Sequence, residues 1–179
     1  MWPTWWPTFA RWPKSSLTGA LKRHRSLHPL SEHHHHVLVQ ALQVRRAGTI
    51  PPSRHAAALE RVARSLVRFW KKTGQKHFRE EEEVLLPAYA RHVPLNQDEA
   101  VMRMLADHAS IRAAFHELQA ALAERRLVEE GVAILGRMLH DHVRLEEEQV
   151  FPRIEATLSE AELLALAPRL TRLYRTKKG

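Results

Sequence analysis

Apolar side chains recur along most of this chain at the spacing of an α-helix. The repeat of three to four residues runs over about residues 31–47, 53–92, 98–125 and 127–150. A strand buried on one face would show apolar residues at every second position, and no segment of the sequence shows that alternation. The pattern therefore predicts four substantial helices and no sheet.

Capping and helix-breaking residues indicate where these helices begin and end. We expect Ser31 to cap the first helix, because a serine hydroxyl can accept a hydrogen bond from a backbone N–H of the first turn. Gly48 follows that helix and ends it. Pro87 marks the end of the second helix or a kink in it, and Pro152 closes the fourth, since proline lacks a backbone N–H.

A short fifth helix follows the four long ones. Ser159 and Glu162 form a capping box, and the apolar spacing then continues to about Leu173. Short connections between helices favour antiparallel neighbours. The sequence therefore predicts an all-α fold, an up-down four-helix bundle with a short C-terminal fifth helix.

Positive charge is concentrated at the two ends of the chain. The net charge is +8, but ten of the 28 lysines and arginines lie in residues 1–30 and 169–179, which leaves 18 bases against 20 acids in the body. A uniformly basic face for nucleic acid is therefore not expected. We divide the chain into a basic N-terminal tail rich in tryptophan and proline (1–27), the bundle domain (28–175) and a basic C-terminal tail (176–179).

The residue types that are missing narrow the possible chemistry. The sequence has no cysteine, which excludes disulfides, iron–sulfur clusters and thiolate zinc sites, so any metal must be held by carboxylates and some of the 13 histidines. No apolar run is long enough to span a membrane. The first residues, MWPTWWPTFARWP, do not have the basic start and apolar core of a signal peptide. We expect a cytoplasmic protein.

One pattern occurs twice on different helices. The motif His-x-Arg-x-Glu-Glu-Glu, followed by apolar residues and a proline, begins at His77 and again at His142. Residues four apart lie on the same face of a helix. His77 with Glu81, and His142 with Glu146, can therefore point at one place in the bundle core. Carboxylates can bridge two metal ions and imidazoles can bind one each, as in helical bundles that hold paired iron.

The other glutamates of the two motifs have a simpler interpretation. We expect Glu82, Glu83, Glu147 and Glu148 to form a solvated acidic face. A single His-x-x-x-Glu occurs in many charged helices, and packed core histidines are the alternative explanation. Two copies in one register, each on an apolar stripe, favour a shared metal site instead.

The first and third helices can supply further histidines to such a site. The third offers His108, which is flanked by apolar residues. The first offers four consecutive histidines from residue 33 onward. His34 is the best candidate, because Leu38 and Ala41 follow it on the same face, and His35 is the alternative.

In this order, with these spacings, residues 31–155 resemble the hemerythrin, or HHE cation-binding, family. The resemblance implies a four-helix bundle that holds two non-haem, carboxylate-bridged iron ions as its cofactor. Carried over by position, the metal ligands are His34, His77, Glu81, His108, His142 and Glu146.

The sequence departs from the oxygen-carrying members of that family at one position. Those members resemble this chain but have a second histidine one turn after the ligand of the third helix. This sequence has Arg112 at that position. Glu80, three residues from His77, is a candidate extra ligand, while its counterpart in the second motif is Leu145. The departure argues against simple reversible carriage of oxygen and leaves sensing or redox chemistry open. We expect a protein that binds or senses a small diatomic ligand such as oxygen or nitric oxide, or iron itself, and an enzyme is the less favoured hypothesis. The alternatives are a di-iron redox enzyme or iron-centre repair protein, and a metal-free or zinc-bound bundle that serves only interaction.

Overall fold

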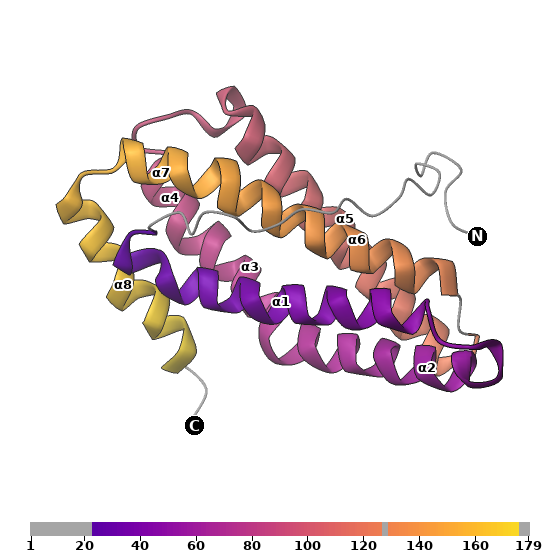
Figure 1. Cartoon of the computed structure of the whole chain (residues 1–179). Helices are drawn as coiled ribbons and strands as arrows, with labels where there is room; N and C mark the ends of the chain where they lie inside the picture. The colour runs from indigo at the N-terminus through magenta and orange to yellow at the C-terminus, as the bar shows by residue number, and fades with distance from the viewer. Residues whose placement is uncertain (1–22, 127–128, 176–179) are drawn as a thin grey trace.

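All regular structure in the described residues, 23–126 and 129–175 of this computed structural model, is helical (Figure 1). This confirms the all-α class. Five continuous α-helical segments are present in this part of the chain, besides a 3₁₀ turn, η4 (Leu95–Gln97), between the second and third of them. They are α1 (His28–Ala47), the segment 52–89, α5 (Glu99–Ala123), the segment 129–157 and α8 (Glu160–Arg175). Residues 1–22 of the expected N-terminal tail and the tail at 176–179 lie outside the described residues.

Two of the segments contain π-helical turns. The second comprises α2 (Pro52–Phe69), η2 (Trp70–Gly74), α3 (Gln75–Glu80), η3 (Glu81–Leu85) and α4 (Leu86–Tyr89). The fourth comprises α6 (Glu129–Leu145), η5 (Glu146–Val150) and α7 (Phe151–Thr157). In both motif copies the turn begins at the proposed bridging glutamate, whose carbonyl accepts a bond from the N–H five residues later. Such turns often accompany functional sites.

These turns explain why two prolines do not end their helices. Helix continues past Pro87 to Tyr89 and past Pro152 to Thr157, so the expectation that Pro152 closes the fourth helix is wrong. Each proline lies in the first turn of the α-helical piece that follows a π turn. A proline is tolerated there because its missing backbone N–H is not needed for the helical hydrogen bonds of the first turn.

The first helix begins earlier than expected. A 3₁₀ turn, η1 (Arg25–Leu27), leads directly into α1 at His28, so Ser31 lies inside the helix and does not cap it. Its hydroxyl donates instead to the carboxylate of Glu147, 2.7 Å away. At the other end of the domain, the expected capping box is present, with Ser159 Oγ donating to Glu162 over 2.8 Å.

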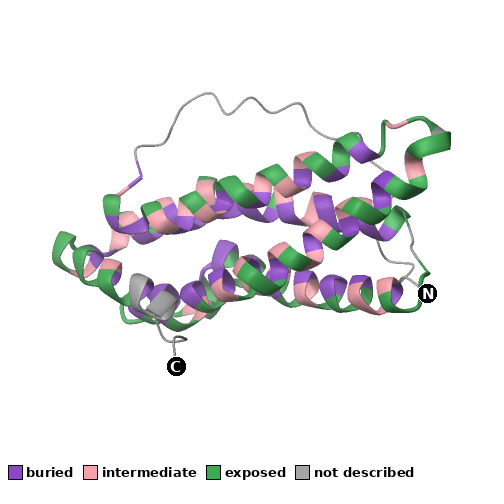
Figure 2. Ribbon diagram, turned by 90° about the horizontal axis from the view of Figure 1, so that it is seen from below, coloured by how far each residue is buried: buried purple, intermediate pink, exposed green. Residues whose placement is uncertain are grey.

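The long helices pack around a common interior. α1 contacts α2 and α6, and α5 contacts the same two helices. Figure 2 shows buried residues along the faces that these helices turn toward one another. At position 136 a Cβ would lie 2.7 Å from a methyl carbon of Val44, so Gly136 allows α1 and α6 to approach closely. None of the described helices has the length and apolar content needed to cross a membrane.

The core consists of two apolar clusters with a polar layer between them. On α1, Leu30 belongs to one cluster and Val37 to the other. On α5, Met104 and Ile111 are divided in the same way. A fully buried leucine or phenylalanine contributes about 1.5–3 kcal/mol, so the two clusters supply the stability that offsets the buried polar groups. The side chains midway between them on the four segments are those that the sequence singled out.

Candidate metal centre

The six candidate ligands come from four helical segments and meet in the interior. Each is at most 2% exposed. They are His34 on α1, His77 on α3, Glu81 at the start of η3, His108 on α5, His142 on α6 and Glu146 at the start of η5. Side chains from distant parts of the sequence are therefore brought together at one buried place.

These residues form two overlapping groups, each able to hold one metal ion. The first group consists of His34, His77, Glu81 and Glu146. The second group consists of His108 and His142 with the same two glutamates. Within each group the potential ligand atoms all lie within 4.8 Å of one another. Glu81 and Glu146 are thus common to both groups.

Each glutamate presents one oxygen to each group. Glu81 Oε1 lies 3.3 Å from His77 Nε2, and its Oε2 lies 3.3 Å from His108 Nε2. Glu146 Oε2 lies 2.9 Å from His34 Nε2, and its Oε1 lies 3.0 Å from His142 Nε2. This is the arrangement that carboxylates need to bridge two ions.

The spacing and bonding of these atoms fit a metal centre. Ligand bonds of about 2.1 Å put neighbouring ligand atoms about 3.0 Å apart at right angles and about 3.4 Å apart at tetrahedral angles. Among the described residues, both oxygens of Glu81 and Glu146 and the Nε2 atoms of His108 and His142 have no hydrogen-bond partner. A buried polar group without a partner costs about 1–3 kcal/mol. Nitrogen and oxygen donors without sulfur suit iron, manganese or zinc.

The second glutamate of each triplet holds a histidine from a neighbouring helix. His34 Nδ1 donates to Glu147 Oε1 over 2.6 Å, and His108 Nδ1 donates to Glu82 Oε1 over 2.7 Å. With the proton on Nδ1, the Nε2 lone pair of each ring faces the interior, as a metal ligand requires. The expectation that Glu82 and Glu147 only face solvent is therefore wrong.

Two arginines and a serine hold these carboxylates in turn. Arg112 Nη2 donates to both oxygens of Glu82, over 2.8 and 2.7 Å. Arg23 Nη2 donates to Glu147 over 2.8 Å, beside the bond from Ser31. Arg112, the departure noted in the sequence, thus supports the carboxylate that orients His108. The sequence contains one sign of this role for Glu82 and Glu147. Each directly follows the bridging glutamate of its own motif copy.

The third glutamate of each triplet behaves as the sequence predicts. Glu83 and Glu148 are exposed, and each pairs with an arginine one turn earlier on its own helix, Arg79 and Arg144. Exposed pairs of this kind contribute little to stability, because solvent screens the two charges. Substitutions of Glu83 and Glu148 are therefore suitable controls for substitutions of the buried glutamates.

The remaining two histidines have different outer neighbours. His142 Nδ1 lies 3.9 Å from Asp107 Oδ2. His77 Nδ1 lies 3.4 Å from His33 Nδ1, and His33 Nδ1 lies 3.5 Å from Glu80 Oε2. Glu80 is 1% exposed, and burial raises the pKa of its carboxyl to about 8.

Without a metal, protons on His34, His108 and His142 balance the buried carboxylates, because the pKa of each of these three histidines is raised. Burial alone would lower the pKa of His108, but the nearby carboxylates of Glu146 and Glu81 raise it to about 10. Burial would likewise raise the pKa of Glu146, but the charge of His142 and the surrounding histidines hold that pKa well below its usual range. The centre therefore favours positive charge where the two glutamates meet.

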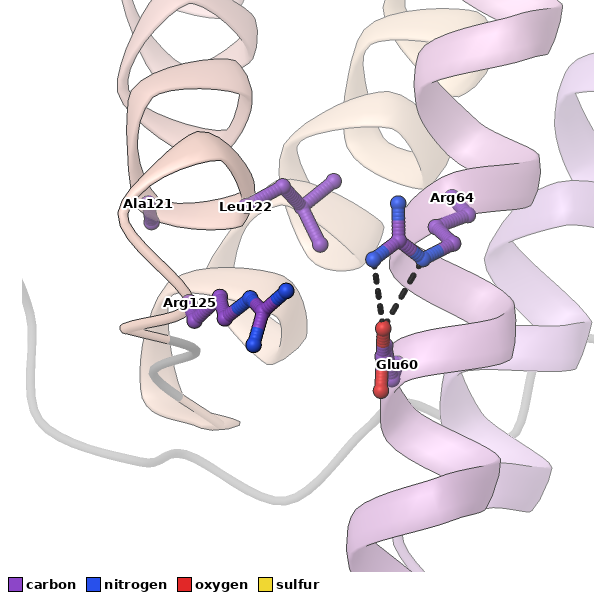
Figure 3. A pocket seen from close by; sticks show the side chains of 5 residues that line it. All are labelled: Glu60, Arg64, Ala121, Leu122 and Arg125. Carbon is purple, nitrogen blue, oxygen red and sulfur yellow. Dashed lines mark hydrogen bonds and ion pairs between the residues drawn. The ribbon is translucent and has the colours of Figure 1, made fainter.

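A surface cavity elsewhere does not compete with this site. It has a volume of about 350 Å³ and lies between α2 and the C-terminal end of α5 (Figure 3). Arg64 donates to Glu60 at its edge, and Arg125, Ala121 and Leu122 complete the lining. It contains none of the six candidate ligands.

Comparison with known proteins identifies the family. No curated protein and no solved structure gives a significant match to the chain. The family model described as the hemerythrin HHE cation-binding domain matches residues 25–154, well over half of the 179 residues. This match includes all six residues and the outer partners of the histidines. The chain therefore belongs to the hemerythrin HHE cation-binding domain family.

Proposed function

We propose that this protein binds two metal ions, and that the ions are iron. His34 and His77 hold one ion, His108 and His142 hold the other, and Glu81 and Glu146 bridge them. One observation carries the proposal, namely that each buried carboxylate directs one oxygen to each pair of histidines. Membership in a cation-binding family supports the same assignment.

We further propose that the centre binds or senses oxygen, nitric oxide or iron in the cytosol. A carboxylate-bridged pair of iron ions supplies one-electron redox chemistry and binding positions for small molecules. The protein's own residues limit which molecules reach it. Phe78 stacks on His108 with ring centroids 3.7 Å apart, and Phe151 stacks on His34 at 5.2 Å. Aromatic rings packed against the ligand histidines in this way exclude bulk water and favour a diatomic ligand over a larger substrate.

The up-down order of the helices belongs to the same proposal. The connection between α1 and α2 consists of residues 48–51, and connections this short join antiparallel neighbours. Antiparallel order also explains how two copies of one motif, on the second and fourth segments, face each other across the interior.

The function is tested by loading the metal-free protein with ferrous iron under anaerobic conditions. Oxygen or nitric oxide is then added while the optical spectrum is recorded. We expect new charge-transfer absorption with iron and none with zinc, and we expect it to be lost in Glu146→Gln. A ferrous protein whose spectrum ignores both gases would contradict the proposal. Catalytic turnover of peroxide would favour the alternative, a redox enzyme.

A further inference from the structure

The four metal-facing histidines do not have equivalent outer neighbours. Three of them have a carboxylate near Nδ1, contributed by Glu147, Glu82 and Asp107. His77 instead has another histidine, His33, which lies beside the buried Glu80. The arrangement beside His77 is therefore a separate feature of the molecule.

We propose that His33, Glu80 and His77 Nδ1 form a third cation site, through which metal ions enter the centre. The proposal rests on the proposed function, because it supplies ions to that centre. Three ligand atoms from these residues lie within 4.8 Å of one another. The nitrogen–nitrogen distance of 3.4 Å and the nitrogen–oxygen distance of 3.5 Å match the separation of about 3.4 Å between two ligands of a tetrahedral ion.

An ion at this site would coordinate the buried carboxylate of Glu80. Its side chain is 1% exposed, and neither carboxylate oxygen accepts a hydrogen bond from the residues described. The charge of Lys76, one turn earlier, acts on Glu80 without a hydrogen bond to it. Burial of a carboxylate is costly unless it is paired or coordinates a metal. Leu145 occupies the equivalent position in the second motif, so the feature exists on one side of the centre only.

The position of His33 provides a route from the surface. Its side chain is 14% exposed, whereas those of His34 and His77 are each 2% exposed. His33 thus lies between solvent and the buried pair of Glu80 and His77. An entry path is one of the features that a functional metal site requires.

The ring of His77 connects the outer and inner sites. Its Nδ1 faces His33, while its Nε2 lies 3.1 Å from His34 Nε2 and 3.3 Å from Glu81 Oε1. A neutral imidazole binds an ion through one nitrogen and carries its proton on the other. An ion bound at Nδ1 must leave before Nε2 can complete the inner group, and the ring proton then moves to Nδ1. The outer site is therefore occupied only in passing.

The test is the rate at which the metal-free protein takes up cobalt(II), followed by stopped-flow absorption. The variants are Glu80→Gln and His33→Asn. The matched controls are Glu83→Gln and His35→Asn, two exposed neighbours on the same helices. We expect uptake to slow by about tenfold or more in the first pair, the size of effect typical of supporting residues. Final metal content should stay at two ions per chain in all four.

Two results would overturn the entry site. The first is uptake at the wild-type rate in both Glu80→Gln and His33→Asn. The second is a final content below two ions in Glu80→Gln, which would make Glu80 a permanent ligand of the inner centre. Failure of the wild-type protein to bind either cobalt(II) or ferrous iron would refute the proposed function itself, so the two failures are distinguishable.

Discussion

Replacing Glu147 with alanine removes the carboxylate that orients His34. The change deletes the 2.6 Å bond to His34 Nδ1 and leaves Ser31 and Arg23 without this acceptor. Loss of such an outer partner typically weakens metal binding by about 10–100-fold. At a metal concentration 100 times the wild-type dissociation constant, metal stabilises the wild-type fold by about 2.7 kcal/mol. The same relation gives about 1.4 to 0.4 kcal/mol for the variant.

The assay is urea denaturation with and without ferrous iron, under anaerobic conditions. The quantity compared is the metal-dependent gain in the free energy of unfolding, so any loss of stability in the metal-free variant cancels. Glu148→Ala is the matched control, because Glu148 is exposed and pairs with Arg144 on its own helix. An equal gain in wild type and Glu147→Ala would refute the role assigned to this carboxylate.

Three further predictions concern the bridges, the N-terminus and the response to acid. Glu146→Ala should abolish most of the metal-dependent gain in melting temperature, because it removes a contact to both ions; a full gain would contradict bridging. A chain lacking residues 1–22 should keep its metal content. A chain lacking residues 1–27 should keep its metal content too but should melt at a lower temperature, because Leu27 is fully buried and Arg23 pairs with Glu155. Hydrogen bonds from His92 and from the backbone of Ser159 lower the pKa of Glu162 to about 2, so its stabilisation is present above pH 4.5 and is lost as pH falls toward 2. Melting of metal-free Glu162→Gln should therefore lose part of the acid dependence seen in wild type, and coincident curves would exclude this contribution.

The sequence could predict the helices and the interior face of the candidate site. Apolar spacing determines which side of a helix is buried, and that spacing selected His34 from four consecutive histidines. The structure places His34 at 2% exposure, while His35 is exposed. The repeated motif likewise indicated that Glu81 and Glu146 point inward.

The sequence could not predict features that depart from regular helical spacing. A π turn adds one residue to a helix, so Pro152 appeared to end a helix that in fact continues to Thr157. Glu82 and Glu147 lie at the boundary between the buried and exposed faces, where periodicity gives no direction. Their partners, His108 and His34, lie on other segments, and only the folded structure brings them together.

The number of metal ions bound per chain decides whether this protein holds a bridged pair of ions. Metal-free protein is loaded with ferrous iron without oxygen, passed over a desalting column and analysed for iron and protein. We expect two ions in wild type and less than one in the double variant Glu81→Gln, Glu146→Gln. One ion or none in wild type, or two ions in the double variant, would contradict a pair of ions bridged by these glutamates.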